Sequence, residues 1–581
     1  MFIPTPLQAK LFPCDEKYSD KEIAELEKSW ARIIKEKILP FLGSVELRFL
    51  QFFHKTMGRP IKYISVLIVM HIFKEMYDWT DEELIEHIKF DKRFEFAFDL
   101  SYEELLVCQK TLHNFRVLIR KQDLARAIFD DATAHIITLF NLDVGRQRID
   151  STHISSNMAK LSRLGLFVRV IENFLYKLKK LNPEAYEALP ARFDERYGQR
   201  RGYFADARSK KVKHRLGESA QDIYDLIDRF KEDEVLSSLK VMAHLQRVFQ
   251  EHCQVRQTQD EVAITVHAPE DEEKSQDPNH SEPKEPSRPE EGSTEVMLKD
   301  AQEVESGSLQ NPSDDEAAYG YKGQGYEATF SETCSESNAF EVITDVQVDP
   351  SCHSDQNTTV DAVDRLEAKG MKPKTMFGDG GFVSGENIVE CREREVDLQG
   401  NLTGVDKEPD RLKLADFTFA EDGLTVEACP AGKPPLDQCA ENARQPKSKA
   451  NESYLVHFDL ESCKRCALAD RCPVKRQKKK ATLRFSLGQL ASSQRRREQE
   501  TEIFKERNNI RAGIESTNGE MKTRQGLGKL RVRRQPVVEQ TVIFKALACN
   551  VKRMVKYVQA IQVIPLMPQN GVKGDAKLAN C

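Results

Sequence analysis

Residues 320–402 alternate between strand-like and helix-like segments, and this order limits the fold more than any other feature. The segments YKGQGYEATFSET (321–333) and AFEVITDVQVD (339–349) have strand character and are separated by a turn, as in a hairpin. They are followed by a helical segment (354–370), a short strand (374–381), a helix that Ser384 would cap, and a last strand (396–402). This order predicts a mixed α/β sheet.

The amino-terminal residues 20–125 have helical periodicity with tight turns between short helices. The apolar run from Ile64 to Phe73 is about half as long as a membrane span and predicts a buried helix. A further helix, predicted over 102–121, carries Arg116 and Arg120. This pattern suits an all-α, helix-turn-helix-like DNA-binding domain over 1–125, although a plain helical bundle fits it equally well.

The net charge of −6 is unevenly distributed along the chain. Residues 269–316 hold sixteen acidic residues, four basic residues and six prolines, so this segment carries −12 and the rest of the chain +6. A Pro-rich acidic segment with few large apolar residues is typical of disorder, which we predict for 267–318. Basic clusters lie at 474–480, 494–498 and 522–534 and favour a polyanionic partner.

Length and cysteine content narrow the class of protein. A chain of 581 residues is too long for one core and predicts several domains. The first residues, MFIPTPLQAKLFPCDEK, lack the basic start and apolar centre of a signal peptide. Thirteen cysteines without such a signal favour thiols or a metal site in a reducing cytoplasm over disulfides. We therefore expect a cytoplasmic protein without a membrane partner.

Three acidic residues stand in positions suited to metal chemistry. Asp150 lies in RQRIDSTHIS, and Asp379 ends a strand at a Gly-Gly turn. In RNNIRAGIESTNGEMKTRQG (507–526), Arg511, Glu515 and Lys522 share one helix side, next to an apolar stripe of Ile503, Ile510, Ile514 and Met521. Carboxylates bind Mg²⁺ or Mn²⁺, and a pair of such ions can clamp a phosphodiester. Taken singly, each acid fits a turn, a cap or a salt-bridged helix as well.

Together these segments resemble the DDE transposases of bacterial insertion sequences. IDSTHIS is similar to the first catalytic strand of that family, and GDGGFVSGENI to its second-aspartate segment. IRAGIESTNGEMK matches the helix signature of Arg, three residues, Glu, six residues and Lys. The chain departs from the family at Asn508 and Phe382, where a Tyr is common.

The resemblance implies a ribonuclease H-like catalytic domain with large insertions. Asp150, Asp379 and Glu515 would then be catalytic metal ligands for Mg²⁺ or Mn²⁺. The DNA contacts would be Arg511, Lys522 and Arg524, with Arg116 and Arg120 in the amino-terminal domain. The expected activity is metal-dependent cleavage at insertion-sequence ends and strand transfer into target DNA. A nuclease on the same fold and a catalytically silent, transposase-derived DNA-binding protein remain alternatives.

The expected partners are double-stranded DNA, as terminal inverted repeats and as target, and a second copy of the chain in a homodimer. The protein would act in the bacterial cytoplasm, at the nucleoid when bound to DNA. The resemblance also sets the expected domains, which follow the helical domain in chain order: a first catalytic strand region (126–155), a helical insertion (156–266), the acidic insert (267–318), the catalytic core (319–402), a cysteine-containing insertion (403–495), the glutamate helix with basic carboxy-terminal helices (496–560), and a flexible tail (561–581).

The cysteine-containing insertion has the spacing of a metal site. Cys463 and Cys466 form a CxxC pair, and Cys472 follows closely. With Cys429 upstream they could form a four-thiolate Zn²⁺ site. Cys439 and His457 are further candidates for ligands, and unligated thiols are the alternative.

Overall fold

The computed structural model of the chain describes residues 14–54, 57, 63–198, 211–257, 294–404, 408–441 and 448–563. The chain divides into two compact units. The first unit contains Met1–Asn157, Gly325–Asp349 and His353–Cys581; the second contains Met158–Gln324 and Pro350–Cys352. None of the helices in these described ranges is long and apolar enough to cross a membrane.

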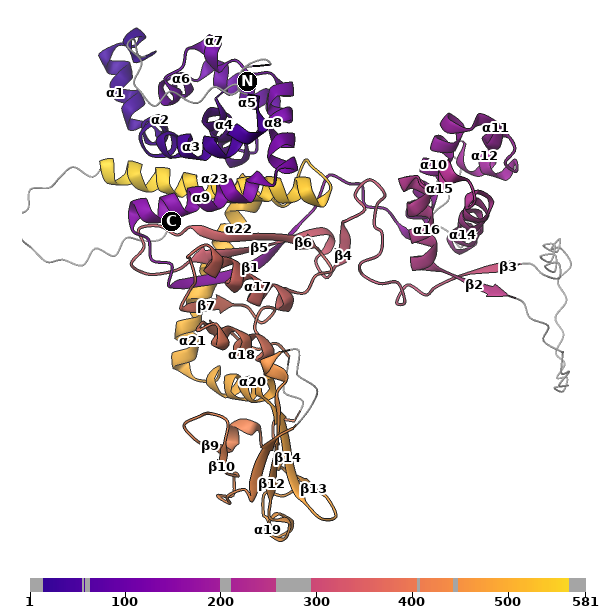
Figure 1. Cartoon of the computed structure of the whole chain (residues 1–581), viewed down its shortest axis with the longest axis vertical. Helices are drawn as coiled ribbons and strands as arrows, with labels where there is room; N and C mark the ends of the chain where they lie inside the picture. Colours follow the sequence, from indigo (N-terminus) through magenta and orange to yellow (C-terminus); the bar gives the residue numbers. More distant parts are fainter. Residues whose placement is uncertain are drawn as a thin grey trace, which may run out of the picture. The chain divides into compact units, whose positions relative to one another are not determined.

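The first unit begins with a group of short helices (Figure 1). In chain order they are η1 (Cys14–Lys17), α1 (Asp20–Lys28), α2 (Trp30–Ile33), η2 (Ile34–Ile38), α3 (Leu39–Val45), η3 (Glu46–Phe52), α4 (Ile64–Met76), α5 (Asp81–Phe90), α6 (Lys92–Phe98), α7 (Tyr102–Leu105), α8 (Gln109–Lys121) and α9 (Leu124–Phe140). The single helix predicted over 102–121 is thus divided into α7 and α8. The helical region also extends through α9, past the predicted boundary at 125.

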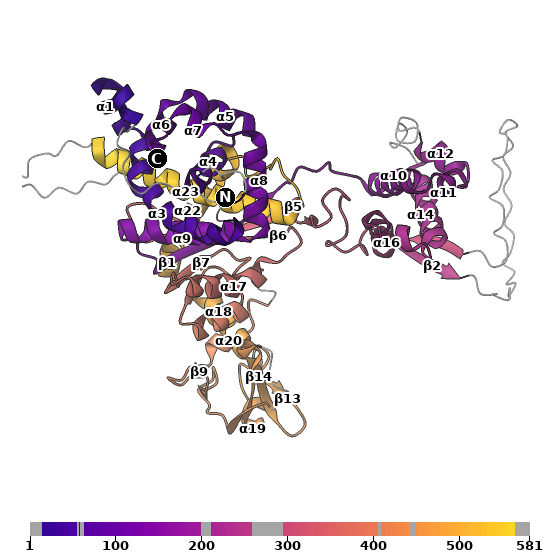
Figure 2. The ribbon, with the colours of Figure 1, turned by 45° about the horizontal axis from the view of Figure 1, so that its top comes forward.

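Helix α4 is the buried helix that the apolar run predicts, and every residue in it except Lys74 is buried. It packs against the long carboxy-terminal helix α23 (Gln535–Val563). Helix α23 also lies beside α9 in both ribbon views (Figures 1 and 2). The two ends of the chain therefore share one helical core within the first unit.

Five strands of the first unit form a mixed sheet in the order β6-β5-β1-β7-β8. They are β1 (Arg146–Ile154), β5 (Gly323–Thr333), β6 (Ile343–Pro350), β7 (Thr375–Gly378) and β8 (Asp397–Gln399). Strand β5 is antiparallel to β1, β7 is parallel to β1, and β8 is parallel to β7. Helix α17 (Asp355–Ala368) leads to β7, and α18 (Gly385–Glu393), capped by Ser384, leads to β8. The mixed α/β sheet predicted from the order of segments is confirmed.

The residues after β8 form a small β-rich region with its own core. Its elements are η4 (Leu414–Asp416), β9 (Thr418–Phe419), β10 (Val426–Ala428), β11 (Asp437–Ala440), η5 (Lys449–Asn451), β12 (Ser453–Phe458), α19 (Leu460–Lys464), β13 (Lys475–Arg476) and β14 (Ala481–Ser486). Four of the strands form an antiparallel sheet, β11-β12-β14-β13, over a core that includes Val456, Leu483 and Phe485.

The next helix, α20 (Leu487–Glu498), packs on α18. Glycines at the contact allow this closeness: a Cβ on Gly385 would lie 2.0 Å from the carbonyl oxygen of Gly488. The boundary predicted at 495 therefore falls inside a helix that packs on α18. The chain continues through α21 (Glu502–Asn508), η6 (Asn509–Ala512) and α22 (Gly513–Arg524) to α23. The predicted tail starts inside α23, and its residues 564–581 lie outside the described residues.

The second unit is a helical bundle with short strands. Its elements are α10 (Arg163–Leu181), α11 (Pro183–Glu187), α12 (Arg192–Tyr197), α14 (Lys211–Phe230), α15 (Glu234–Ser237), α16 (Lys240–His252), β2 (Cys253–Gln257), β3 (Thr294–Leu298) and β4 (Ala318–Gly320). Strands β2 and β3 pair antiparallel. The core includes Phe167, Phe174 and Ile223.

The prediction of disorder over 267–318 is wrong for residues 294–318. Strand β3 pairs with β2, and Leu309 is 1% exposed within the helical core. Lys240 on α16 pairs with Asp315 at 2.8 Å, so the acidic charge is compensated locally. Apolar burial and charge pairing thus outweigh the acidic composition here. Residues 258–293, which include nine of the sixteen acidic residues, lie outside the described residues.

Candidate active site

Asp150 lies on the central strand β1, on the opposite face from the buried side chain of Ile149. Ile149 is fully buried in the core that α17 and α18 form with the sheet. Because side chains alternate along a strand, Asp150 projects from the other face. There Oδ2 of Asp150 accepts a hydrogen bond of 2.9 Å from Nδ2 of Asn518 on α22. The first predicted carboxylate thus faces the helix that carries the third.

Asp379 follows directly after strand β7. Gly378, the last residue of β7, is in register with Ile149 on the parallel strand β1. Asp150 and Asp379 are therefore the next residues after this register position on two neighbouring parallel strands, although β1 continues to Ile154. The carboxylate of Asp379 is held by the backbone N–H of Gly381, which donates to Oδ1 at 2.8 Å.

Glu515 lies in the first turn of α22, and its side chain is 65% exposed. Ile514 and Met521 on the same helix are fully buried, so the predicted buried stripe beside Glu515 is confirmed for these two of its four residues. Glu515 precedes Asn518 by three residues, and residues at this spacing share one helix side. Glu515 therefore lies about one turn along α22 from the contact with Asp150.

The predicted continuous helix over 507–526 is wrong. The 3-10 turn η6 separates α21 from α22, and Ile503 is 80% exposed instead of belonging to the buried stripe. Nη1 of Arg148 on β1 donates to the carbonyl of Ile510 at 3.0 Å. In an uninterrupted α-helix that carbonyl would accept the N–H of Ile514. Arg511 thus lies in η6, with its Nη2 3.6 Å from Oε1 of Glu515.

A buried carboxylate that the motifs did not include fixes α22 to the sheet. Glu332 on β5 is fully buried; it accepts from Arg148 Nε at 2.8 Å and from Thr517 Oγ1 at 2.7 Å. Arg553 on α23 also binds it. Burial alone would raise the pKa of Glu332, but the guanidinium groups of Arg553 and Arg148 outweigh burial and lower it. Glu332 is therefore charged and joins β1, β5, α22 and α23.

Two further acidic residues lie near the predicted site. The hydroxyl oxygen of Ser151 lies within hydrogen-bonding distance of two carboxylates, 3.1 Å from Asp355 Oδ2 and 3.0 Å from Glu327 Oε1. A Cβ on Gly381 would lie 3.0 Å from Asp379 Oδ1 and 3.1 Å from Asp355 Oδ2, so these two carboxylates flank the same glycine. Sequence analysis missed Asp355 and Glu327 because neither belongs to a recognisable spacing. Strand register alone brings Glu327 close to β1, where it lies opposite His153.

The predicted DNA-binding cations differ in their surroundings. Lys522 and Arg524 are exposed near the end of α22. Arg116 forms a two-pronged ion pair with Asp81, at 2.9 and 2.6 Å, and Arg120 donates to Gln540 at 3.2 Å. Both of these arginines line a groove together with residues 531–533. Their contact with DNA stays a prediction. Because Arg116 is paired with Asp81, a DNA phosphate would have to compete with that carboxylate for the guanidinium group.

The donor atoms suit a hard cation, although the carboxylates are not gathered around one point. Among the residues that the structure describes, no group of three or more His, Cys, Asp or Glu side chains is placed to hold a metal ion. Asp150, Asp379 and Glu515 nevertheless supply the oxygen ligands that Mg²⁺ and Mn²⁺ prefer. Beside Asp150, Asn518 Oδ1 is buried and has no hydrogen-bond partner among the described residues. An unsatisfied buried oxygen of this kind fits a cation site.

The four predicted zinc ligands line one small cavity in the β-rich region. The cavity has a volume of about 30 Å³ and is lined by Cys429, Cys463, Cys466 and Cys472. This is about the volume that one molecule occupies in liquid water. Burial, and then the neighbouring cysteines, raise the pKa of Cys463. Thiol ligands lose their protons when a metal binds. Neighbouring thiols that do not readily ionise by themselves are therefore compatible with a metal site.

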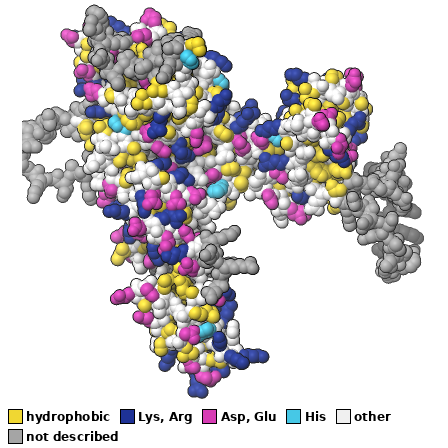
Figure 3. All heavy atoms as spheres, viewed as in Figure 1, with side chains coloured by type: hydrophobic (Ala, Val, Ile, Leu, Met, Phe, Trp, Pro, Cys, Tyr) yellow, Lys and Arg dark blue, Asp and Glu magenta, His cyan; other side chains and the backbone are white. Residues whose placement is uncertain are grey.

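The two further candidates for zinc ligands lie elsewhere. Cys439 is exposed, and its Sγ is 3.8 Å from the carbonyl of Leu455. His457 Nδ1 contacts Asp437 at 2.5 Å. Neither lines the cavity. The basic cluster at 474–480 is exposed after Val474, and Figure 3 shows dark-blue side chains at this end of the region.

Comparison with known families adds independent evidence for the carboxy-terminal part of the chain. Residues 428–555 match a family model described as Transposase DDE domain. The match supports a DDE transposase. The matched transposase segment contains the cysteine cluster, α22 with Glu515, and most of α23, whereas Asp150 and Asp379 lie before it. A search of curated proteins and a search of solved structures each found no match.

Proposed function

We propose that this chain is a DNA transposase with a ribonuclease H-like catalytic domain. It cleaves DNA at the ends of a bacterial insertion sequence and joins the freed ends to target DNA, acting as a homodimer. The strand arrangement supports this fold: β1 lies in the middle, a consecutive pair of strands lies on one side, and two parallel strands lie on the other. The match to a transposase DDE domain supports the activity.

The main support for the proposal is that three elements, β1, β7 and α22, are neighbours. Asp150 and Asp379 follow the same register position on β1 and β7. Helix α22 crosses next to β1, where Asn518 binds Asp150 and Glu515 lies three residues earlier. A central strand, the end of its neighbour and one helix have no structural need to carry three carboxylates. The alignment of Asp150 with Asp379, and the contact that links α22 to Asp150, therefore favour a catalytic role over a turn or a cap.

In this proposal Asp150, Asp379 and Glu515 bind Mg²⁺ or Mn²⁺. The ions supply stabilisation of the negative charge that develops on the attacking and leaving oxygens. Asn518 orients the carboxylate of Asp150, and the Gly381 N–H orients that of Asp379. Arg511, Lys522 and Arg524 bind phosphates beside the scissile bond.

The reaction has two parts that use the same site. Water attacks the phosphorus at the element end, and the bond from phosphorus to the 3′ oxygen breaks. This leaves a 3′-hydroxyl and a 5′-phosphate. The 3′-hydroxyl then attacks a phosphodiester of target DNA, forms a new bond to phosphorus, and releases the 3′ oxygen of the target strand. Such chemistry depends on positioning and charge stabilisation and needs no nucleotide cofactor.

We also propose that Cys429, Cys463, Cys466 and Cys472 hold a structural Zn²⁺. Four thiolates without an open position are typical of structural zinc sites. The ion would fasten α19 and the loop at 463–472 to the strand region, which has only a small apolar core of its own.

Incubation of the protein with DNA that carries the inverted repeats flanking its gene tests the function. A transposase will cut at the repeat ends only with Mg²⁺ or Mn²⁺ and will join the 3′ ends to a second DNA. Cutting without joining, at sites unrelated to the repeats, would favour the nuclease. Specific binding to the repeats without cutting would favour the silent DNA-binding protein.

A further inference from the structure

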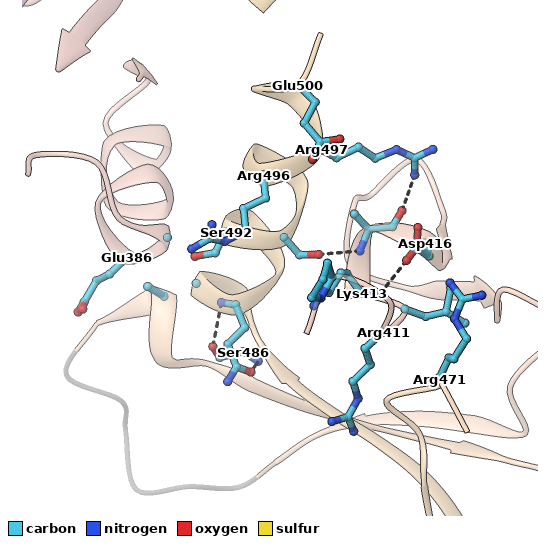
Figure 4. Close-up of a pocket in the computed structure, with 18 of the residues that line it drawn as sticks. Glu386, Arg411, Lys413, Asp416, Arg471, Ser486, Ser492, Arg496, Arg497 and Glu500 are labelled. Carbon is cyan, nitrogen blue, oxygen red and sulfur yellow. Dashed lines mark hydrogen bonds between the residues drawn. The ribbon is translucent and has the colours of Figure 1, made fainter. Parts of the chain in front are cut away.

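A large polar groove lies between α20 and the segment that leads into the β-rich region. Its volume is about 890 Å³, and Figure 4 shows the residues that line it. Basic side chains come from both of its walls: Arg411, Lys413 and Arg471 on one side, Arg496 and Arg497 from α20 on the other. Three acidic residues, Glu386, Asp416 and Glu500, accompany these five cations. The lining therefore carries a net positive charge.

Three of the guanidinium groups are held in place without losing their charge. Arg497 Nη1 donates to the carbonyl of Ala415 at 2.8 Å, and Arg496 donates to the carbonyls of Thr403 and Gly404 at 3.0 Å each. Arg471 Nε donates to the carbonyl of Asp410 at 2.5 Å. None of the three has a carboxylate partner within the described ranges of the chain.

This arrangement differs from that of ordinary surface arginines. A carbonyl fixes the direction of a guanidinium but does not neutralise it, and each guanidinium has five N–H donors. Arg471 and Arg497 are exposed, so their remaining donors can reach a ligand. Positive charges held in fixed directions around an open groove suit the oxygens of phosphate groups.

The other lining residues indicate what kind of phosphate ligand fits. Serines, Asn451 and Gln489 supply hydrogen bonds, Leu412 is the one large aliphatic side chain in the lining, and the lining contains no aromatic side chain. A base or another flat apolar group would find nothing to stack on. An extended sugar-phosphate backbone presents only charge and polar groups to such a surface.

The place of the groove in the chain connects it to the proposed catalytic site. Gly385 and Glu386 line the groove and begin α18, only six residues after Asp379. The opposite wall, α20, leads through α21 to α22 and Glu515. The groove therefore lies on the helices that follow Asp379 and lead to Glu515 in the chain.

We propose that this groove binds the phosphate backbone of double-stranded DNA next to the cleavage site. The inference rests on the proposed function, which names DNA as substrate. It adds a contact surface on α20 and the 408–416 segment that the catalytic motifs do not include.

The test is DNA binding by the full-length protein with Arg471 and Arg497 both changed to Gln. Glutamine keeps an N–H that can donate to the carbonyls of Asp410 and Ala415 but removes the charge. Arg229→Gln is the matched control, because Arg229 is exposed and also donates to a backbone carbonyl, that of Ala188, at 2.9 Å. Binding to a double-stranded oligonucleotide is measured over a range of salt without divalent metal, and thermal unfolding checks that both variants fold.

We expect the double variant to bind the duplex at least tenfold more weakly at low salt. The slope of log affinity against log salt should fall by about two units, because each lost phosphate contact removes about 0.9. Arg229→Gln should match the wild type. A wild-type slope in a folded double variant would overturn the groove proposal while leaving the transposase proposal standing. A wild type that binds no DNA at all would instead overturn the proposed function.

Inorganic pyrophosphate distinguishes a small-anion site from a DNA groove. If the groove holds DNA, pyrophosphate should compete no better against wild type than its ionic strength predicts. Saturable pyrophosphate binding that is lost in Arg471→Gln/Arg497→Gln, with unchanged duplex binding, would contradict the proposal.

Discussion

Asn518 links the proposed glutamate helix to the first proposed aspartate, although no part of the transposase signature requires it. It is 7% exposed, its Nδ2 binds Asp150, and its Oδ1 has no hydrogen-bond partner in the part of the chain that the structure describes. A polar side chain so deeply buried costs stability unless each of its groups is satisfied. The burial of Asn518 beside Asp150 therefore points to a role in positioning that carboxylate or in completing a cation site.

Asn518→Ala should reduce DNA cleavage by 10- to 100-fold, the usual effect of removing a group that orients a metal ligand. The concentration of Mg²⁺ needed for half-maximal cleavage should rise, whereas DNA affinity without metal should not change. Ser516→Ala, on the exposed side of the same helix, is the control. Equal Mg²⁺ dependence of the two variants would limit Asn518 to a structural role.

Side-chain positions could be predicted from the sequence where periodicity is regular, and could not where one distant residue intervenes. The burial of Ile514 and Met521 follows from helical spacing. The exposure of Ile503 does not, because Arg148, more than 350 residues earlier, takes the carbonyl of Ile510 and is in contact with the start of α22. For the same reason spacing could not predict the roles of Asn518 and Glu332: their partners lie on strands and helices far away in the chain.

At the level of elements, the order of strands and helices over 320–402 was predictable and the neighbours of β1 were not. Local alternation defines each strand, but pairing of β1 with both β5 and β7 depends on contacts across hundreds of residues. The β-rich region was predicted only as an insertion with cysteines. Its strands are short and half-buried, so their periodicity is weak.

Zinc should stabilise the β-rich region specifically. Cys463→Ser should remove bound zinc and lower the melting temperature of this region, because a structural metal contributes folding free energy directly. Cys439→Ser is the control, since its thiol is exposed and does not line the cavity. Elemental analysis of protein purified without chelators measures the metal. Protein that contains no zinc would rule the site out.

Acid should weaken the contact between α4 and α23. Burial alone would raise the pKa of Glu75, but the ammonium groups of Lys545 and Lys74 outweigh it and lower the pKa to about 2. Because this folded-state pKa lies below the ordinary 4.5, Glu75 stabilises the fold fully above pH 4.5, and this stabilisation is lost as the pH falls toward 2.

Glu75→Gln should lower the free energy of unfolding at neutral pH by at most about 3 kcal/mol. The loss stays limited because Asp78 remains 3.0 Å from Lys545 Nζ. The variant should also show a flatter pH dependence between pH 4.5 and 2. Urea unfolding at a series of pH values measures both effects, and a pH profile identical to that of the wild type would exclude this ion pair as the cause.

At the scale of the whole molecule, the chain consists of two units. Composition led to a wrong prediction for part of the second unit. Overall charge predicted that 267–318 is disordered, yet short apolar runs inside it, at Val296, Leu298 and Leu309, pack on the helical core. Averaging over a long segment hides such runs. The alternation of residue types in Thr294–Leu298 was the signal in the sequence that could have predicted strand β3.

Deletion of 294–316 should therefore unfold or strongly destabilise the second unit, because it removes β3 and Leu309. The point variant Leu309→Ala tests the same idea more mildly and should cost about 2–5 kcal/mol, the usual range for a buried leucine. Exposed Val235→Ala is the control. A melting profile of Leu309→Ala that matches the control would show that the segment does not contribute to the core.

The central claim is that Asp150, Asp379 and Glu515 form one metal-dependent site for DNA cleavage. Its most direct test is cleavage of element-end DNA in Mg²⁺ by the wild type and by Asp150→Ala, Asp379→Ala and Glu515→Ala, with DNA affinity measured in parallel. The account predicts that all three variants bind DNA about as well as the wild type and that none of them cuts it. A folded variant that cuts at nearly the wild-type rate would contradict the assignment of that residue, and two such variants would contradict the site.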